Sequence, residues 1–168
     1  MERIVRFHND HEYLSNFFPV PREVLWGYPT VEHYYQGMKV DPEQAGCRAY
    51  RENIKSLTSS HSDTVKAKRL GQFPQMQVMG VHLRDTWEIG LKLEVMKMGL
   101  EAKFSVPHLA RALVSTGDVV LVEGNFWHDN FWGICLCDSC LPKNQGLNHL
   151  GLELIELRVK LQRRELQQ

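Results

Sequence analysis

Glu32 stands in a group of residues whose types could carry acid–base chemistry. Glu32, Gln36 and Lys39 are spaced by four and three residues, which places them on one side of a helix. An isolated glutamate near a helix start is usually a solvated acid that the helix dipole stabilises. Here Tyr34 and Tyr35 lie within the same two turns. This crowd of aromatic and polar groups shifts the interpretation towards a functional carboxylate.

A second group is the segment of residues 123–133, which contains two carboxylates, one imidazole, two amides and four aromatic rings. Apolar surroundings raise the pKa of a carboxyl group, and this keeps an acid protonated near neutral pH. The alternative is an aromatic-rich hairpin end with ordinary solvated acids. The residue types leave these two interpretations balanced, and Asp129 is the candidate if the segment is functional.

Trp87 lies in a strongly periodic apolar segment, and this favours a core tryptophan over a ligand platform. An indole at the mouth of a site would instead stack on a base, which contributes about 1–3 kcal/mol per base.

Cys135, Cys137 and Cys140 place three thiols within six residues. Thiolates suit soft metals, and His128 or His149 could complete a tetrahedral zinc site. Only one pair has the common Cys-x-x-Cys spacing, and the second pair that usually completes such a site is missing. The pattern therefore favours free thiols of a surface loop, and we predict no metal.

The elements that must position these residues are mainly helical. The clearest helix covers residues 82–102, where apolar side chains recur every three or four positions. Helices are also expected over residues 31–40, 42–53, 62–71, 107–114 and 148–165, and strands over residues 4–7, 24–26, 119–123 and 131–136. The last two strands are candidates to pair with each other. Helices and strands do not alternate regularly, so the prediction is α+β, a predominantly α-helical single domain over residues 1–168 with a small β-sheet.

Charge and motifs exclude several classes of protein. The chain of 168 residues has 20 basic and 20 acidic side chains, and proteins that coat nucleic acid need a basic excess. It has no Gly-x-Gly-x-x-Gly, Walker, Gly-x-Ser-x-Gly or His-Glu-x-x-His motif. No apolar run is long enough for a membrane span, and the first ten residues do not resemble a secretion signal. We therefore expect a cytoplasmic protein without a membrane partner.

Several short motifs follow one another over about residues 7 to 161. They are Tyr13-Leu14-Ser15-Asn16-Phe17-Phe18, Glu32-His33-Tyr34-Tyr35-Gln36 with Lys39, Trp87, Lys103-Phe104, Val122-Glu123, Asp129 with Trp132-Gly133, and Gly146-x-Asn148-x-Leu150-Gly151 ending in Arg158. Together and in this order, they resemble the NADAR superfamily of YbiA-like N-glycosidases.

The resemblance implies a compact, mostly helical fold and hydrolysis of N-glycosidic bonds of phosphoribosyl compounds. Two substrate classes are associated with the family. One is phosphoribosylamino-pyrimidine intermediates of riboflavin synthesis, and the other is ADP-ribose attached to guanine in nucleic acid. The expected partners are therefore a phosphoribosyl or ADP-ribosyl substrate, including ADP-ribosylated nucleic acid. The balanced charge favours a small molecule or single nucleotide over extended duplex DNA.

By the same resemblance, catalytic roles are expected for Glu32, Asp129 and Trp87. Glu32 would be the general base or electrostatic stabiliser of an oxocarbenium-like transition state. Asp129 would orient the ribose or water, or protonate the leaving group, and Trp87 would stack on the base or sugar.

Substrate binding is expected of five further residues and needs no cofactor. Lys39 is the first candidate for a phosphate contact, ahead of Arg84 and Lys92. The five residues are Asn16, Tyr35, Lys39, Trp132 and Asn148. The alternative is a module that binds ADP-ribose or a nucleotide without cleaving it. Two acids in the pocket argue against it, because they repel an anionic ligand.

Overall fold

The computed structural model describes residues 2–143 and 146–167. Most of the ordered elements are helices, as the sequence predicts. They are α1 (Val31–Gly37), α2 (Cys47–Ser56), α3 (His61–Leu70), α4 (Phe73–Val78), α5 (Lys92–Lys103), α6 (Pro107–Ser115) and α7 (His149–Glu165). Among the described residues, no helix is both long enough and apolar enough to cross a membrane.

The strands are short and form two parallel pairs. They are β1 (Arg3–Val5), β2 (Val120–Val122), β3 (Gly124–Asn125) and β4 (Ile134–Cys135). β1 pairs with β2 so that Arg3 lies opposite Val120, and β3 pairs with β4 so that Gly124 lies opposite Ile134. Because β3 and β4 run in the same direction, residues 126–133 must carry the chain back to the start of the pair.

The chain divides into two compact units. The central unit is Asn16–Ser105, and the terminal unit is Met1–Ser15 with Val106–Gln168. The central unit contains α1 to α5, and the terminal unit contains the four strands with α6 and α7.

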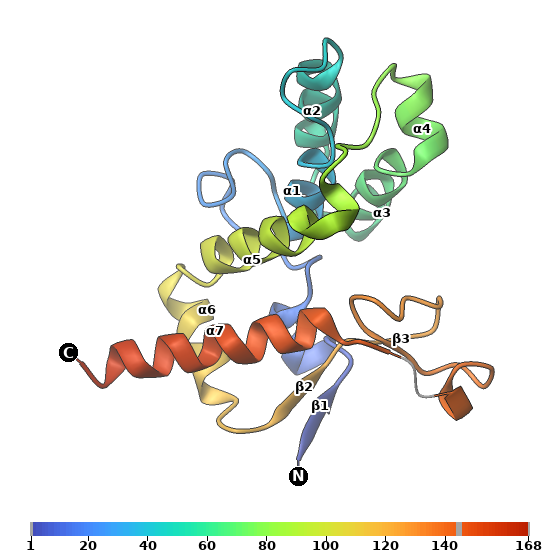
Figure 1. Ribbon diagram of the computed structural model, residues 1–168. Helices are drawn as coiled ribbons and strands as arrows, with labels where there is room; N and C mark the ends of the chain where they lie inside the picture. The colour runs from blue at the N-terminus through green and yellow to red at the C-terminus, as the bar shows by residue number, and fades with distance from the viewer. Residues whose placement is uncertain (1, 144–145, 168) are drawn as a thin grey trace. The chain divides into compact units, whose positions relative to one another are not determined.

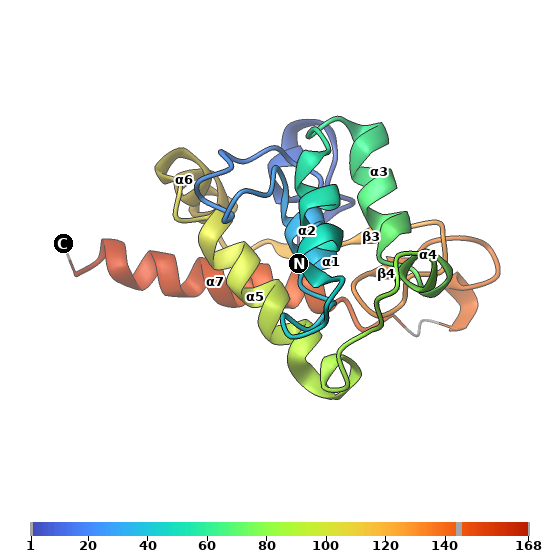
Figure 2. The same cartoon turned by 90° about the horizontal axis from the view of Figure 1, so that it is seen from above.

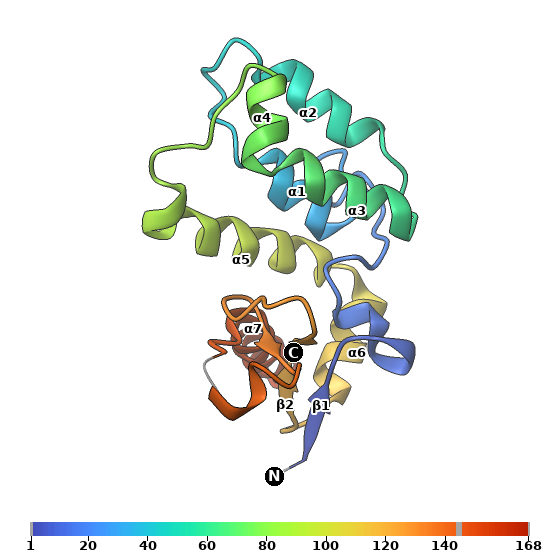
Figure 3. The ribbon, with the colours of Figure 1, turned by 90° about the vertical axis from the view of Figure 1, so that its right-hand side faces the viewer.

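Helix α1 lies at the centre of the central unit, where it packs against α2, α3 and α5 (Figure 3). Its N-cap is Thr30, whose hydroxyl accepts from the backbone N–H of His33 at 3.3 Å. All seven residues of α1 are buried, although Glu32, His33 and Gln36 are polar. Viewed from above, α2 and α3 lie beside α1, and α3 leads into α4 (Figure 2). A buried helix with polar side chains requires partners for them within the unit.

In the terminal unit, α7 packs on α6 and β2 through an apolar stripe (Figure 1). Leu150, Leu154 and Leu157 of this stripe are buried, as the spacing predicts. Arg158, one turn past Leu154, donates to the Thr116 hydroxyl at 2.7 Å and to the Val119 carbonyl at 2.9 Å. The helix is thereby tied to the turn that precedes β2.

The prediction of a mostly helical chain with little sheet is confirmed, and several local predictions are wrong. Residues 24–26 form a turn, with left-handed backbone at Trp26 and Gly27, and not a strand. The predicted helix 82–102 starts later than expected, because residues 82–86 are not helical. A π-helical turn, Trp87–Leu91, in which Gly90 has φ +140°, comes directly before α5. The two late strands do not form one pair, since β2 pairs with β1.

The boundaries of the other elements shift by a few residues. The helix expected from residue 42 begins at Cys47, and the helix expected over residues 62–71 covers His61–Leu70, with Ser60 as its N-cap. Helix α4 was not expected, because its six residues are too few for a periodic pattern. The final helix agrees with the prediction within a residue.

Burial of His33 makes the stability of the protein depend on pH. Burial, together with the nearby Arg22 charge, lowers the pKa of His33 from its ordinary value of 6.5 to about 4. The unfolded chain then binds a proton at pH values where the folded chain does not. The stability contributed by neutral His33 is present above about pH 6.5 and is lost as pH falls towards 4.

We therefore expect the free energy of unfolding to decline between pH 6.5 and pH 4 more steeply in the wild type than in a His33→Gln variant. Urea unfolding at several pH values measures both slopes. Equal slopes in this window would show that His33 titrates normally in the folded state.

Candidate active site

Glu32 is a buried carboxylate held by the helix that carries it. Its side chain is 7% exposed, and its Oε1 accepts a hydrogen bond of 2.7 Å from Nε2 of Gln36, one turn along α1. The backbone N–H of Glu32 donates to the Asn16 carbonyl at 3.0 Å. The spacing of four residues produces the contact that the sequence indicates. The carboxylate is therefore fixed in direction, which a catalytic group requires.

Two buried oxygens close to Glu32 in the structure have no hydrogen-bond partner among the described residues. They are Oδ1 of Asn16 and Oε1 of Gln36. The Asn16 amide nitrogen donates to a weak acceptor, the Met96 sulfur, at 3.4 Å. Unsatisfied buried acceptors cost about 1–3 kcal/mol each. Hydroxyl or amino groups of a bound ligand would satisfy them.

Lys39 follows α1 and is also withdrawn from solvent. Its ammonium donates to the Gly71 carbonyl at 2.9 Å and lies 5.6 Å from the centre of the Tyr35 ring. Burial lowers the pKa of Lys39, while the charges of Glu32 and Glu88 act in the opposite direction. An ammonium has three donors, so the contact with Gly71 leaves capacity for an anionic ligand.

Trp87 and Tyr35 form an aromatic pair, with ring centres 5.0 Å apart. Trp87 is 2% exposed, which is the burial expected of a core residue. Its backbone N–H bonds the Arg84 carbonyl, and the N–H of Arg84 bonds the carbonyl of Lys39 at 2.9 Å. Backbone hydrogen bonds through Arg84 therefore connect Lys39 to the start of the π-helical turn. The stacking role of Trp87 stays a prediction.

The other two cations considered for phosphate both lie near acidic side chains. Lys92 forms an ion pair with Glu88 at 2.6 Å, and Arg84 lies 3.8 Å from a carboxylate oxygen of Asp41. Lys39 lies nearer to Glu32 in the sequence, and its charge interacts with that of Glu32. It is therefore the best placed of the three candidates.

In the terminal unit, Asp129 lies in the loop between β3 and β4. Its Oδ1 accepts from the backbone N–H groups of Phe131 at 3.1 Å and Trp132 at 2.9 Å. Asn125 organises the preceding turn. Its Oδ1 accepts from the N–H of Asp129 and its Nδ2 donates to the Asp129 carbonyl at 2.7 Å. Side chains bonded to backbone therefore determine where the Asp129 carboxylate points.

Trp132 and Asn148 lie at the end of this loop and at the start of α7. Trp132 meets Phe131 edge to face at 5.0 Å. Asn148 has left-handed backbone, and its side chain accepts from the N–H of Glu123 at 3.0 Å and donates to the Leu121 carbonyl at 2.9 Å. Both polar atoms of Asn148 thus join α7 to the chain around β2. Asn148 is a positioning residue for these elements, and its contact with substrate stays a prediction.

The predicted site residues fall into two groups, one in each unit. Asn16, Glu32, Tyr35, Lys39 and Trp87 belong to the central unit, and Asp129, Trp132 and Asn148 to the terminal unit. Three residues that support these groups are absent from the predicted site. The helical spacing of Gln36 from Glu32 indicates its role in the sequence. The position of Asn125 beside a turn indicates its role only weakly, and the sequence marks Gly71 only as the end of a helix.

Known proteins are similar to this chain over most of its length. An N-glycosidase of Nostoc punctiforme is 32% identical over 88% of this chain and 83% of its own length. N-glycosidase YbiA of Escherichia coli is 34% identical over 95% of this chain and 89% of its own. The NMR structure of E. coli YbiA superposes with a TM-score of 0.73 over 100% of this chain and 90% of that one, at 32% identity. The chain is therefore an enzyme of the N-glycosidase class.

The profile of the NADAR domain matches residues 6–162. The chain belongs to the NADAR family, with YbiA-like proteins among its relatives. The chloroplastic riboflavin biosynthesis protein PYRR of maize (Zea mays) is 39% identical over 88% of this chain. This chain spans 23% of the maize protein's length.

Gly71 gives a test of the packing around Glu32. A Cβ at Gly71 would overlap the Gln36 side-chain oxygen, while the backbone of Gly71, at φ −82°, accepts alanine. We expect Gly71→Ala to lower the free energy of unfolding by about 1–3 kcal/mol. The loss should disappear when Gln36→Ala removes the colliding group. Chemical denaturation of the two single variants and the double variant measures this coupling. An equal cost of Gly71→Ala in both backgrounds would contradict the contact.

Proposed function

We propose that this enzyme hydrolyses the N-glycosidic bond between a base and a phosphorylated ribose. The observation that carries the proposal is Glu32, a carboxylate that is 7% exposed and oriented by Gln36. Such a bond breaks through a transition state in which positive charge develops at the anomeric carbon. A fixed negative charge in a poorly solvated site stabilises that charge more than water does.

Glu32 would act on the anomeric carbon either directly or through water. As an electrostatic stabiliser it would face the oxocarbenium-like carbon, and as a general base it would take a proton from the attacking water. The buried acceptors Asn16 Oδ1 and Gln36 Oε1 lack partners among the described residues, and ribose hydroxyls would supply donors. The predicted pocket role of Asn16 comes from the family resemblance, and its unpartnered oxygen supports that role.

Asp129 would orient the ribose or the attacking water. Its Oδ1 receives two backbone N–H groups, which suits a carboxylate that acts as an acceptor. Its other oxygen makes no hydrogen bond among the described residues and remains available to a hydroxyl. This arrangement favours orientation over protonation of the leaving base among the roles considered for Asp129.

Two aromatic residues and one amide complete the proposed binding set. Trp87 with Tyr35, and separately Trp132, offer flat apolar rings to a base or a sugar face. Asn148 would act mainly through the position of α7, because its amide is bonded to backbone.

The favoured substrate is a phosphoribosylamino-pyrimidine. The maize relative is named a riboflavin biosynthesis protein, and the balanced charge of this chain suits a small anionic molecule. ADP-ribosyl-guanine has the same scissile linkage to a phosphorylated ribose. It is therefore the second substrate in the experiment that tests the proposal.

We expect the wild type to release ribose 5-phosphate from the pyrimidine compound, and Glu32→Gln to lower kcat roughly 10²- to 10⁴-fold. The amide keeps the size and the hydrogen-bonding ability of the carboxylate but removes its charge, so KM should change little. Release of ribose 5-phosphate is measured beside release of ADP-ribose from an ADP-ribosylated single-stranded oligonucleotide. The matched control is Glu52→Gln, an exposed glutamate of α2 in the same unit.

The outcomes separate the possible conclusions. Release of ADP-ribose alone would assign the enzyme to nucleic-acid repair. Near-normal turnover by Glu32→Gln would remove Glu32 from the catalytic role. Binding of ADP-ribose with cleavage of neither substrate would contradict the proposed reaction.

The pH dependence of KM tests Lys39 as the phosphate contact. Burial lowers the pKa of Lys39, so the ammonium loses its proton at a lower pH than a free lysine does. A phosphate contact made by the protonated form would weaken as pH rises through that value. We expect KM for the phosphorylated substrate to rise about tenfold or more in the alkaline range, in keeping with the loss of one charged hydrogen bond.

Lys39→Arg is the matched control, because a guanidinium stays protonated over the whole range. The alkaline rise in KM should disappear in this variant, even if its KM at neutral pH is higher. The same alkaline rise in Lys39→Arg would assign the titration to another group.

A further inference from the structure

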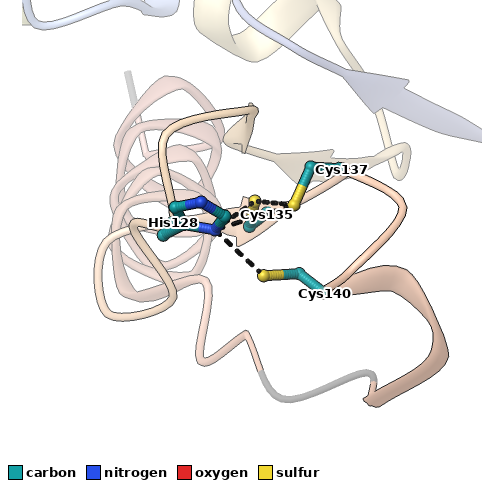
Figure 4. Close-up of side chains that lie close together, drawn as sticks. All are labelled: His128, Cys135, Cys137 and Cys140. Carbon is teal, nitrogen blue, oxygen red and sulfur yellow. Dashed lines mark hydrogen bonds between the residues drawn. The ribbon is translucent and has the colours of Figure 1, made fainter.

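Four potential metal ligands meet in the terminal unit, in the loop beside β3 and β4. They are the imidazole of His128 and the thiols of Cys135, Cys137 and Cys140 (Figure 4). One ligand atom from each lies within 4.8 Å of all the others. The sequence had favoured free thiols because a second cysteine pair is missing. The fold supplies a histidine in its place.

Four of the six distances between these atoms are close to the edges of a tetrahedron around one small cation, and the other two are within 4.8 Å. Nδ1 of His128 lies 3.3 Å from Sγ of Cys140, 3.6 Å from Sγ of Cys137 and 3.8 Å from Sγ of Cys135. The sulfurs of Cys135 and Cys137 are 3.3 Å apart. Zinc–sulfur bonds of about 2.3 Å and zinc–nitrogen bonds of about 2.0–2.1 Å imply edges of roughly 3.4–3.8 Å.

The loop holds His128 in a conformation that needs an explanation. Its φ is +65°, a left-handed backbone that non-glycine residues adopt rarely. Such a conformation persists where surrounding contacts determine it. Here it accompanies an imidazole directed at three thiols (Figure 4). Neutral hydrogen bonds between sulfur and nitrogen are weak, whereas bonds to a metal are strong.

The second layer around the cluster also fits a metal site. Asn130 accepts from the N–H of Cys135 at 2.9 Å through its side-chain oxygen, and its Nδ2 lies 3.9 Å from the Cys140 sulfur. The backbone N–H of Cys140 donates to the Cys137 carbonyl, which closes the turn between these two ligands. Outer contacts of this kind orient ligands and offset thiolate charge.

The structure also chooses between the two candidate histidines. His149 packs its ring against Phe131, with ring centres 4.5 Å apart. The histidine of the cluster is His128, and His149 is not part of it. The fourth cysteine, Cys47, lies in the central unit and bonds the Val40 carbonyl there.

We propose that His128, Cys135, Cys137 and Cys140 bind one zinc ion in a structural site. Three thiolates and an imidazole complete a tetrahedron and leave no open position for water or substrate, so the ion would not catalyse the reaction. It would instead join β4 to the loop that carries Asp129 and Trp132. The proposal replaces our expectation of no metal and does not depend on the proposed substrate.

The test is the metal content of the full chain, purified without a histidine tag and without chelators. We expect one zinc per chain by mass spectrometry of the elements. Replacement by Co²⁺ should give the visible absorption bands of tetrahedral thiolate coordination. Cys140→Ser and His128→Gln should each lower the zinc content and the melting temperature. The matched controls, Cys47→Ser and His149→Gln, should keep the full zinc content.

Thiol counting provides a second measurement that needs no variant. In the native protein, a thiol reagent should react slowly with the three ligand cysteines and rapidly after a strong chelator is added. Wild-type protein that binds no zinc when supplied with it, or that has fewer than four thiols when denatured without reductant, would overturn the proposal. The latter result would indicate a disulfide between loop cysteines. Neither readout depends on N-glycosidase activity, so failure here leaves that proposal standing.

Discussion

Burial of α1 is the constraint on which the central unit depends. A helix of seven residues is too short to be stable alone, so its stability comes from packing against α2, α3 and α5. That packing also encloses Glu32 and His33. Burying a polar group costs free energy unless the group is hydrogen-bonded, and burying an unpaired charge costs more. The partners of these side chains are therefore part of what makes the fold possible.

The same constraint explains why the groups around Glu32 come from separate parts of the sequence. Gln36 is supplied by α1 itself, but Lys39 bonds Gly71 at the end of α3. Only a residue without a side chain lets the end of α3 approach Gln36 so closely. The aromatic pair then adds apolar surface at Tyr35. A site in a small protein is thus built from the contacts that close its core.

What could be predicted from the sequence follows from the range of the interactions. Two features are local and periodic, and the sequence therefore predicts them. They are the spacing of Glu32, Gln36 and Lys39 and the apolar stripe of α7. Gly71 has no such signal, because its importance comes from a contact 35 positions away in the sequence with Gln36. The pairing of the strands could not be predicted, for a related reason. Strands of two or three residues are too short to show an alternation of apolar and polar residues. Their partner strands can also lie far away in the sequence, as β1 and β2 do.

Different interactions hold the two groups of candidate residues in place, and this determines which substitutions each group tolerates. Around Glu32, apolar packing determines position, and small changes of volume are felt because cores are close-packed. Around Asp129, two strands of two residues each cannot fix a loop of eight residues by themselves. Asn125, Asp129 and Asn130 supply the missing restraints as side-chain bonds to backbone. Such a loop tolerates changes in its exposed aromatic residues more readily than loss of a single amide. The three thiols follow the same logic, since a polar loop with little core to bury gains rigidity only from bonds that its own side chains make.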